Sequence, residues 1–266
     1  SDFQRCEEKD GTEFFNPSAP FGLVAVNDPG GRNIDTSFGS YFVYRKMQQN
    51  IKGFSDQTKQ FASLLSSAVG REIDHEYTGA LVFGRFKDGT PVAMNSDEAK
   101  KPLFNNFNYY EDTKGLKCPF QSHIRKTNPR GDTNRKNRIP LGSERGHRIA
   151  RRGISYGSKD ITPSSEWTDS GLLFLSCQSD IEQQFLLMQC AWSDNPNFLI
   201  EGTGTDPITG EQNAGGDKGA KKWRLQIDKK KVSVDFQYQD LVKIRGGEYF
   251  FAPSISFCRK FNINES

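Results

Sequence analysis

The sequence lacks long apolar runs and an excess of either charge. A membrane-spanning helix needs about 20 consecutive apolar residues, and no stretch of these 266 residues comes near that length. A membrane span is therefore excluded, and no membrane partner is expected. Lys and Arg number 36 against 33 Asp and Glu, a net charge of +3. This balance does not call for a polyanionic partner, so no nucleic acid is expected to bind.

Paired cysteines are missing too. The five cysteines are odd in number and widely spaced, and no two form a C-x-x-C pair. Neither a zinc site nor a disulfide framework is therefore predicted. The first residues also lack the basic and then apolar pattern of a secretion signal. Unpaired cysteines and the lack of a visible signal make a reducing compartment, the cytoplasm, the default expectation.

Short apolar runs and two segments of helical spacing indicate a mixed fold. Apolar residues recur at helical spacing over 51–68 and 181–192. Residues 88–147 have little periodicity, and a loop of that length usually has a function. Aromatic and β-branched runs bounded by turn residues predict strands at 23–26, 39–47, 80–86, 172–177, 232–236 and 241–244. The pattern predicts an α+β fold, an antiparallel sheet with helices on one face. Loops are expected at 1–20 and 202–222.

Histidine is scarce, and its three positions differ in their surroundings. His75 lies in a polar stretch that is expected to be exposed, and His147 lies in a basic run that disfavours metal binding. His123 follows the apolar Cys118-Pro119-Phe120 and precedes a basic stretch. Haem iron takes a neutral imidazole, and its propionates need Arg or other hydrogen-bond donors at the pocket rim. This junction could therefore serve both the iron and the propionates of a haem, although basic loops of no special function are common.

The segment CPFQSHIRKTNPR (118–130) resembles the proximal haem segment of dye-decolorising (DyP-type) peroxidases. Other segments resemble that family in the same order along the chain: 39–54, 84–92, RIARRGISYG (148–157), 171–192, DPITG (206–210) and RGGEYFFAPSIS (245–256). The resemblance implies a ferredoxin-like antiparallel sheet of the dimeric α/β-barrel superfamily. In this interpretation residues 1–20 are a loop or a linker remnant, and residues 21–266 are the C-terminal haem-binding domain.

The resemblance also implies roles for single residues. His123 would be the axial ligand of the iron in haem b, and Arg151 the catalytic arginine on the distal side. Asn128 and Arg130 would contact the haem propionates or support the proximal loop. Phe174 and Phe185 would pack against the haem, though ordinary core packing explains them equally well. Arg152 is expected to be a structural ion-pair partner.

The activity that the resemblance implies is a peroxidase reaction. Hydrogen peroxide would be cleaved, and an aromatic compound, phenol or dye would be oxidised. Further partners would be the N-terminal half of the family's fold or other copies of the same chain.

The chain departs from the family at the G-x-x-D-G motif, whose aspartate lies on the distal side of the haem. Its nearest counterpart, Glu7-Glu8-Lys9-Asp10-Gly11, lacks the first glycine, and Asp10 is expected to be a solvated turn residue. The alternative function is therefore a haem-binding but inactive fragment or subunit whose partner supplies the distal aspartate.

Two other interpretations remain open. From Arg125 through Arg152 there are ten Lys or Arg and only two acids, so a phosphate-binding module is conceivable. A relative of chlorite dismutases would share a haem histidine on a similar fold, but it would not predict the segments at 151–157 and 246–256.

Overall fold

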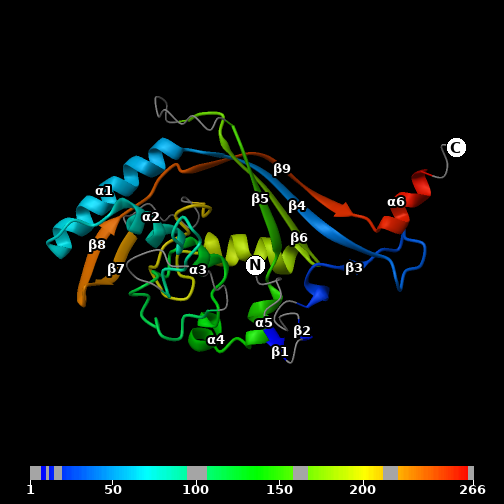
Figure 1. The fold of residues 1–266 in the computed structure, drawn as a ribbon, viewed down its shortest axis with the longest axis horizontal. Helices are drawn as coiled ribbons and strands as arrows, with labels where there is room; N and C mark the ends of the chain where they lie inside the picture. Colours follow the sequence, from blue (N-terminus) through cyan, green and yellow to red (C-terminus); the bar gives the residue numbers. More distant parts are fainter. Residues whose placement is uncertain are drawn as a thin grey trace.

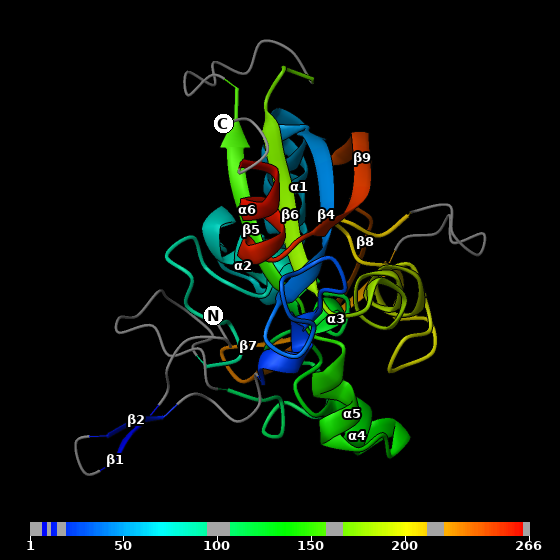
Figure 2. The ribbon, with the colours of Figure 1, turned by 90° about the vertical axis from the view of Figure 1, so that its right-hand side faces the viewer.

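The computed structural model describes residues 7–9, 12–14, 20–94, 107–157, 167–211 and 221–262. Its main sheet has four long strands: β4 (Phe38–Gln49), β5 (Ala150–Tyr156), β6 (Gly171–Gln178) and β9 (Val242–Ala252). They lie side by side in the order β9-β4-β6-β5, and every neighbouring pair is antiparallel (Figures 1 and 2). Since helices follow the first and third of these strands, the topology is ferredoxin-like. The predicted α+β class and ferredoxin-like sheet are confirmed.

The helix after β4 has clear end signals. Helix α1 (Ile51–Val69) begins after Asn50, whose side chain accepts a hydrogen bond from the N–H of Gly53 at 2.7 Å. It ends at Gly70, whose φ of 90° lies in the left-handed region that glycine adopts without strain. The helix predicted over 51–68 is thus confirmed.

The strand predicted over 80–86 is wrong. Most of it belongs to helix α2 (His75–Phe83), which begins after Asp74 and ends at Gly84. The helix buries Tyr77 together with the apolar run from Ala80 to Val82, so the run shows no helical period. A short apolar run that is buried on all sides fits a strand and a helix equally well.

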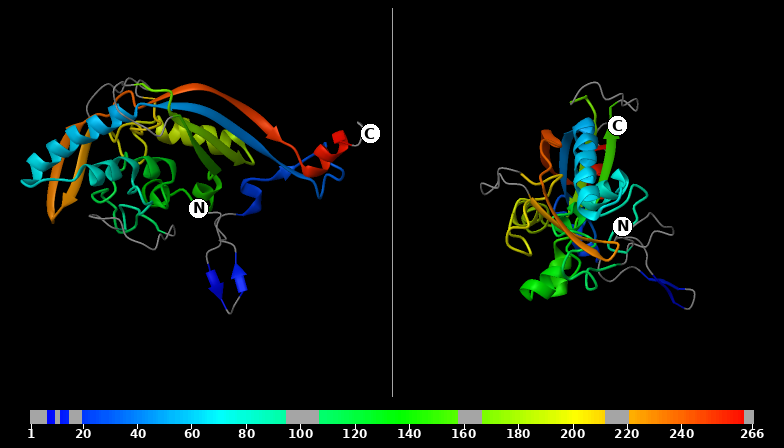
Figure 3. Two further views of the ribbon diagram at one scale, coloured as in Figure 1. Left: turned by 45° about the horizontal axis from the view of Figure 1, so that its top comes forward. Right: turned by 90° about the vertical axis from the view of Figure 1, so that its left-hand side faces the viewer.

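The largest apolar core lies beside the main sheet. It forms between α1, α2 and the hairpin of β7 (Lys221–Ile227) and β8 (Lys230–Phe236), at the end of the molecule opposite α6 (Ile255–Asn262) (Figure 3). At its centre Phe61 stacks on Phe236 at 5.1 Å and contacts Trp223 at 4.8 Å. The strand predicted over 232–236 is confirmed, whereas β5 and β7 were not predicted.

Near the N-terminus the expectations are only partly met. Instead of an unbroken loop, residues 1–20 include the short paired strands β1 (Glu7–Lys9) and β2 (Thr12–Phe14). The strand predicted over 23–26 is also wrong in most of its length. Residues Phe21–Leu23 form a single 3-10 turn, η1, and only the two-residue strand β3 (Val26–Asn27) pairs with β4.

The other predicted elements fare better. Strand β6 and the predicted helix over 181–192, which is η2 (Ile181–Ser193), are confirmed. Helix η2 is wound as a π-helix, so at its end the N–H of Asp194 bonds the carbonyl of Gln189 five residues earlier. Residues 241–244 were predicted as a strand and lie at the start of β9. Among the described residues, no helix has the length and apolar character needed to span a membrane.

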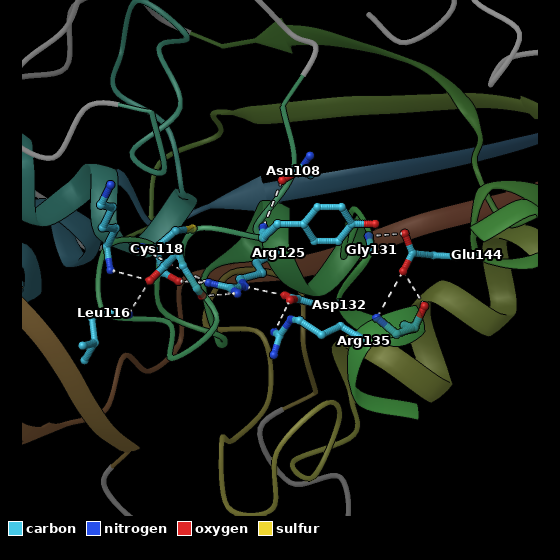
Figure 4. A network of polar contacts seen from close by, with 12 residues as sticks. Asn108, Leu116, Cys118, Arg125, Gly131, Asp132, Arg135 and Glu144 are labelled. Atoms are coloured by element: carbon cyan, nitrogen blue, oxygen red, sulfur yellow. Dashed lines mark hydrogen bonds and ion pairs between the residues drawn. The ribbon is translucent and has the colours of Figure 1, made fainter. Parts of the chain in front are cut away.

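The stretch 88–147 contains three short helices where a loop was expected: α3 (His123–Thr127), α4 (Asp132–Asn137) and α5 (Leu141–Gly146). The fully buried guanidinium of Arg125 lies at its centre (Figure 4). It donates to Asp132 at 2.7 Å, to Asp112 at 2.9 Å and to the carbonyl of Cys118 at 2.5 Å. Burial by itself lowers the pKa of Arg125, but the hydrogen bond and charge of Asp132 outweigh it, so Arg125 stays charged.

Asp112 and Asp132 each make further contacts. Asp112 binds backbone N–H groups, and Asp132 binds a second cation. Asp112 accepts the N–H groups of Leu116 and Cys118 at 2.8 and 2.9 Å. Asp132 also pairs with Arg135 at 2.5 Å. A similar contact joins α4 and α5, where the buried Glu144 accepts the N–H of Gly131 at 2.6 Å (Figure 4). Polar contacts therefore order a segment whose sequence shows no helical period.

We expect Arg125→Leu to destabilise the fold strongly, because it removes the shared cation of two buried carboxylates and leaves Asp132 with Arg135 alone. Breaking a buried ion pair from one side costs about 3–5 kcal/mol. The matched control is Lys52→Ala, which removes a partly exposed pair with Asp56 on α1 and should cost less than about 1 kcal/mol. Urea unfolding monitored by circular dichroism measures both, and equal costs would contradict the assigned role of Arg125.

Candidate functional site

The candidate site is built around His123, the first residue of α3. The preceding residue, Ser122, is fully buried and its hydroxyl donates to the carbonyl of Leu81 in α2 at 2.5 Å. The ring of Phe83 meets the imidazole edge-on at 6.3 Å. Helix α3 also contacts η2, so His123 starts a helix held between two others. Its side chain is 21% exposed.

The imidazole of His123 is bound to a buried carboxylate. Its Nδ1 lies 2.7 Å from Oδ2 of Asp206, whose side chain is fully buried. Asp206 also accepts the N–H groups of Ile208 and Thr209 at 2.8 and 3.2 Å. Burial alone would raise the pKa of Asp206, but the contact with His123 and these N–H groups hold it below its ordinary value. An ionised Asp206 keeps the proton of His123 on Nδ1 and leaves the lone pair on Nε2.

Asp206 was not singled out from the sequence. It lies 83 residues from His123, and nothing in the local pattern links the two. The sequence signal that could have identified Asp206 is its position as the first residue of DPITG, a segment that resembles the family.

A buried lysine lies on the same short helix. Lys126 is fully buried, and its ammonium donates to the carbonyls of Trp192 and Asn195 at 3.2 and 2.7 Å. These carbonyls lie at the C-terminal end of η2, where a positive charge is favourable. Burial lowers the pKa of Lys126 to about 7, and the charge of Asp206 counteracts part of this shift.

Arg151 lies on the face of the sheet that η2 covers. It pairs with Ser176 on β6, and Phe174, two residues away on that strand, points to the same side. The ring of Phe174 packs against Phe185 of η2 at 6.1 Å, which identifies this side. Arg151 itself is exposed. Arg152 points to the opposite face, as expected for alternate residues of a strand.

The two phenylalanines form part of the packing between sheet and helix. Phe185 contacts Tyr249 of β9 at 6.3 Å, and the guanidinium of Arg45 lies 5.2 Å from the Phe185 ring. The contacts that Phe174 and Phe185 make in the structure are thus with protein side chains. Their packing against a haem stays a prediction.

Asn128 and Arg130 lie where α3 ends. The N–H of Asn128 bonds the carbonyl of Ile124 at 2.9 Å and closes the helix. Arg130 has a φ of 46°, unusual for a non-glycine residue. Its guanidinium donates to the carbonyl of Phe107 at 3.2 Å and lies 4.0 Å from that ring. Their contacts with haem propionates also stay a prediction.

The other histidines lie apart from this cluster. His75 is 60% exposed, as expected. Nδ1 of His147 lies 2.5 Å from the carbonyl of Gln183, and its ring meets Trp192 edge-on. Asp10, the nearest counterpart of the distal aspartate, falls outside the described residues.

Comparison with known proteins places this chain in one family. Residues 6–201 match the family "Dyp-type peroxidase, C-terminal". The multifunctional dye peroxidase DyP2 of Amycolatopsis sp. is 37% identical over 262 residues, which cover 94% of this chain and 54% of that protein. The chain therefore belongs to the DyP-type peroxidase family, whose members are haem enzymes.

Solved structures agree with this assignment. The crystal structure of a DyP-type peroxidase from Anabaena sp. is 44% identical with a TM-score of 0.74, covering 90% of this chain and 49% of that one. The structure of DyP2 from Amycolatopsis sp. is 35% identical with a TM-score of 0.79, covering 94% and 55%. The chain thus spans about half the length of the relatives it matches.

The donor set around His123 fits a haem iron. A neutral imidazole with its Nδ1–H held by a carboxylate is the usual form of a metal-bound histidine. Among the described residues Nε2 of His123 makes no hydrogen bond, so its lone pair is not committed elsewhere.

The lowered pKa of Lys126 has a consequence for stability. Between about pH 7, its pKa in the folded chain, and 10.5, its ordinary value, the unfolded chain binds more protons. The contribution of Lys126 to the free energy of unfolding should therefore rise with pH through this window. In urea unfolding at several pH values, the free energy of unfolding of wild type minus that of Lys126→Met should increase as pH increases.

The control is Lys230→Met. Lys230 also donates to the last carbonyls of a helix, those of Ala68 and Val69, but from an exposed position. The free energy of unfolding of wild type minus that of Lys230→Met should stay constant over the same pH window. A constant difference for Lys126→Met as well would contradict the shifted pKa.

Proposed function

We propose that this chain is the haem-binding part of a peroxidase that uses hydrogen peroxide to oxidise dyes, phenols or other one-electron donors. The cofactor is haem b, and His123 is its axial iron ligand. The observation that carries the proposal is the 2.7 Å contact between His123 Nδ1 and the buried Asp206. Membership of the family and its curated relatives, which are named as dye-decolorizing peroxidases, support it.

Each residue of the chain has a defined task in this proposal. Haem, when bound, supplies the redox chemistry of peroxide cleavage and of electron uptake from the donor. Asp206 holds the proton at Nδ1 of His123, so Nε2 is available as a neutral ligand. Arg151 supplies a guanidinium that offers positive charge to the oxygen that leaves during peroxide cleavage. Asn128 and Arg130 support the proximal loop or bind propionates, and Phe174 and Phe185 line the cofactor.

A second candidate is a haem-binding unit that needs another polypeptide segment or chain for the distal acid. Two observations favour it. The chain spans about half of its relatives, and the sheet face that carries Arg152 also exposes Ile154 and Phe250, which are 50% and 49% exposed. Such an apolar face suits contact with further protein, from the rest of a longer chain or from another copy.

The ligand assignment predicts that His123→Ala abolishes the Soret absorption band of the haem-loaded protein, because the iron loses its axial imidazole. His75→Ala is the control, since that side chain is exposed and remote, and it should leave the band intact. Absorption spectra after reconstitution with haem measure both. Equal loss in the two variants, or no Soret band in wild type, would refute the assignment.

Replacing the distal arginine should slow peroxide cleavage. We expect Arg151→Leu to lower the rate of reaction with hydrogen peroxide by about 10²–10³-fold, the usual effect of removing one electrostatic stabiliser. Arg152→Leu, a neighbour on the opposite sheet face, should change it little. Stopped-flow absorption of the haem-loaded chain gives both rates relative to wild type. Comparable losses would show that Arg151 has no special role.

A further inference from the structure

Two buried residues, Lys126 and Asp206, meet at the C-terminal end of η2. Lys126 donates to the carbonyls of Trp192 and Asn195. The backbone N–H of Asp206 donates to the carbonyl of Ser193, which directly follows Trp192, at 2.8 Å. One helix end thus holds a fully buried ammonium and a fully buried carboxylate.

His123 connects this pair to the candidate site. It lies three residues before Lys126 on α3, so the two side chains leave the same side of the helix. Its Nδ1 contacts the carboxylate of Asp206. The two charges interact, since the carboxylate of Asp206 counteracts part of the effect of burial on the pKa of Lys126. Charges act strongly on one another where water is excluded.

We propose that Lys126 is a positioning residue for His123 that acts through Asp206. Its buried ammonium offsets part of the carboxylate's charge and so limits how strongly Asp206 draws the Nδ1 proton of the imidazole. The inference rests on the proposed function only in so far as His123 binds haem iron.

The electronic consequence has a definite sign. A histidine whose Nδ1 proton is drawn more strongly becomes a stronger donor through Nε2, which favours ferric over ferrous iron. Removing the charge of Lys126 should therefore make the reduction potential of the bound haem more negative. Other charges near Lys126 are those of Asp194 and Lys221, and both remain in such a variant.

A purely structural role predicts something different. Lys126 also satisfies two carbonyls at the end of η2, and losing those hydrogen bonds would loosen α3 without regard to charge. Lys126→Gln keeps a hydrogen-bond donor and removes the charge, whereas Lys126→Arg keeps the charge. The two variants therefore separate the electrostatic role from the structural one.

The test is a redox titration of the haem-loaded full chain at about pH 6, where Lys126 is protonated in wild type. Lys126→Met and Lys126→Gln should shift the haem potential to more negative values, while Lys126→Arg should stay near wild type. Lys230→Met, which removes an exposed lysine from another helix end, is the matched control and should cause no shift. A shift of Lys126→Arg equal to that of Lys126→Gln would overturn the proposal.

A double-mutant cycle tests the path through Asp206. If Lys126 acts through that carboxylate, the shift caused by Lys126→Met should shrink in an Asp206→Asn background. A shift of the same size in both backgrounds would mean that Lys126 acts on the haem directly, and the proposal would be wrong.

A haem-free measurement separates this inference from the proposed function. In the chain without cofactor, proton NMR reports the Nδ1 proton of His123, whose resonance moves downfield as its hydrogen bond strengthens. Lys126→Gln should move it downfield and Asp206→Asn upfield. Failure to bind haem would refute the proposed function alone, whereas an unmoved resonance in Lys126→Gln would overturn the inference.

Discussion

The burial of the Arg125 guanidinium between Asp112 and Asp132 is the constraint on which the rest of the site depends. It lies two residues after His123 in a segment with almost no apolar periodicity. Without a cation at that point, two buried carboxylates would face each other across the loop. The ion pairs therefore stabilise residues 107–146, as an apolar core stabilises other regions, and they hold the start of α3 in place.

The protein divides its stabilising interactions between two regions. The apolar core packs α1 and α2 against the β7–β8 hairpin, around Phe61 and Trp223. The region of His123 is held by charge instead: the pairs of Arg125, the contact of Asp206 with the imidazole, and Lys126 at the end of η2. A site that must hold a polar ligand in a fixed orientation gains from such directional contacts, because hydrogen bonds specify geometry more tightly than apolar packing.

The main sheet links this region to the residues expected on the other side of a cofactor. One face carries Arg151 and Phe174 towards η2, and the opposite face leaves Ile154 and Phe250 exposed. The alternation of a β-strand separates the two neighbouring arginines onto these two faces. A single strand thereby places Arg151 on the face that η2 covers and Arg152 on the opposite face.

Local pattern was sufficient for α1, β4, β6 and η2, because each has a clear period or clear end signals. It failed for α2, whose apolar run is buried on all sides, and for β5 and β7, whose alternation is masked by charged residues. The resemblance of residues 118–130 to a family singled out His123, and the structure shows that His123 contacts a buried carboxylate whereas His75 is exposed.

By itself, then, the sequence determined the ferredoxin-like class and the family, and it pointed to His123 as the candidate ligand, since these follow from ordered local motifs. Only the tertiary structure decided that Asp206 holds that histidine, that Lys126 is buried beside them, and that Arg125 pairs with two buried acids, 7 and 13 residues away. Those contacts join residues up to 83 positions apart. Their existence depends on chain closure and burial, which no local window of the sequence contains.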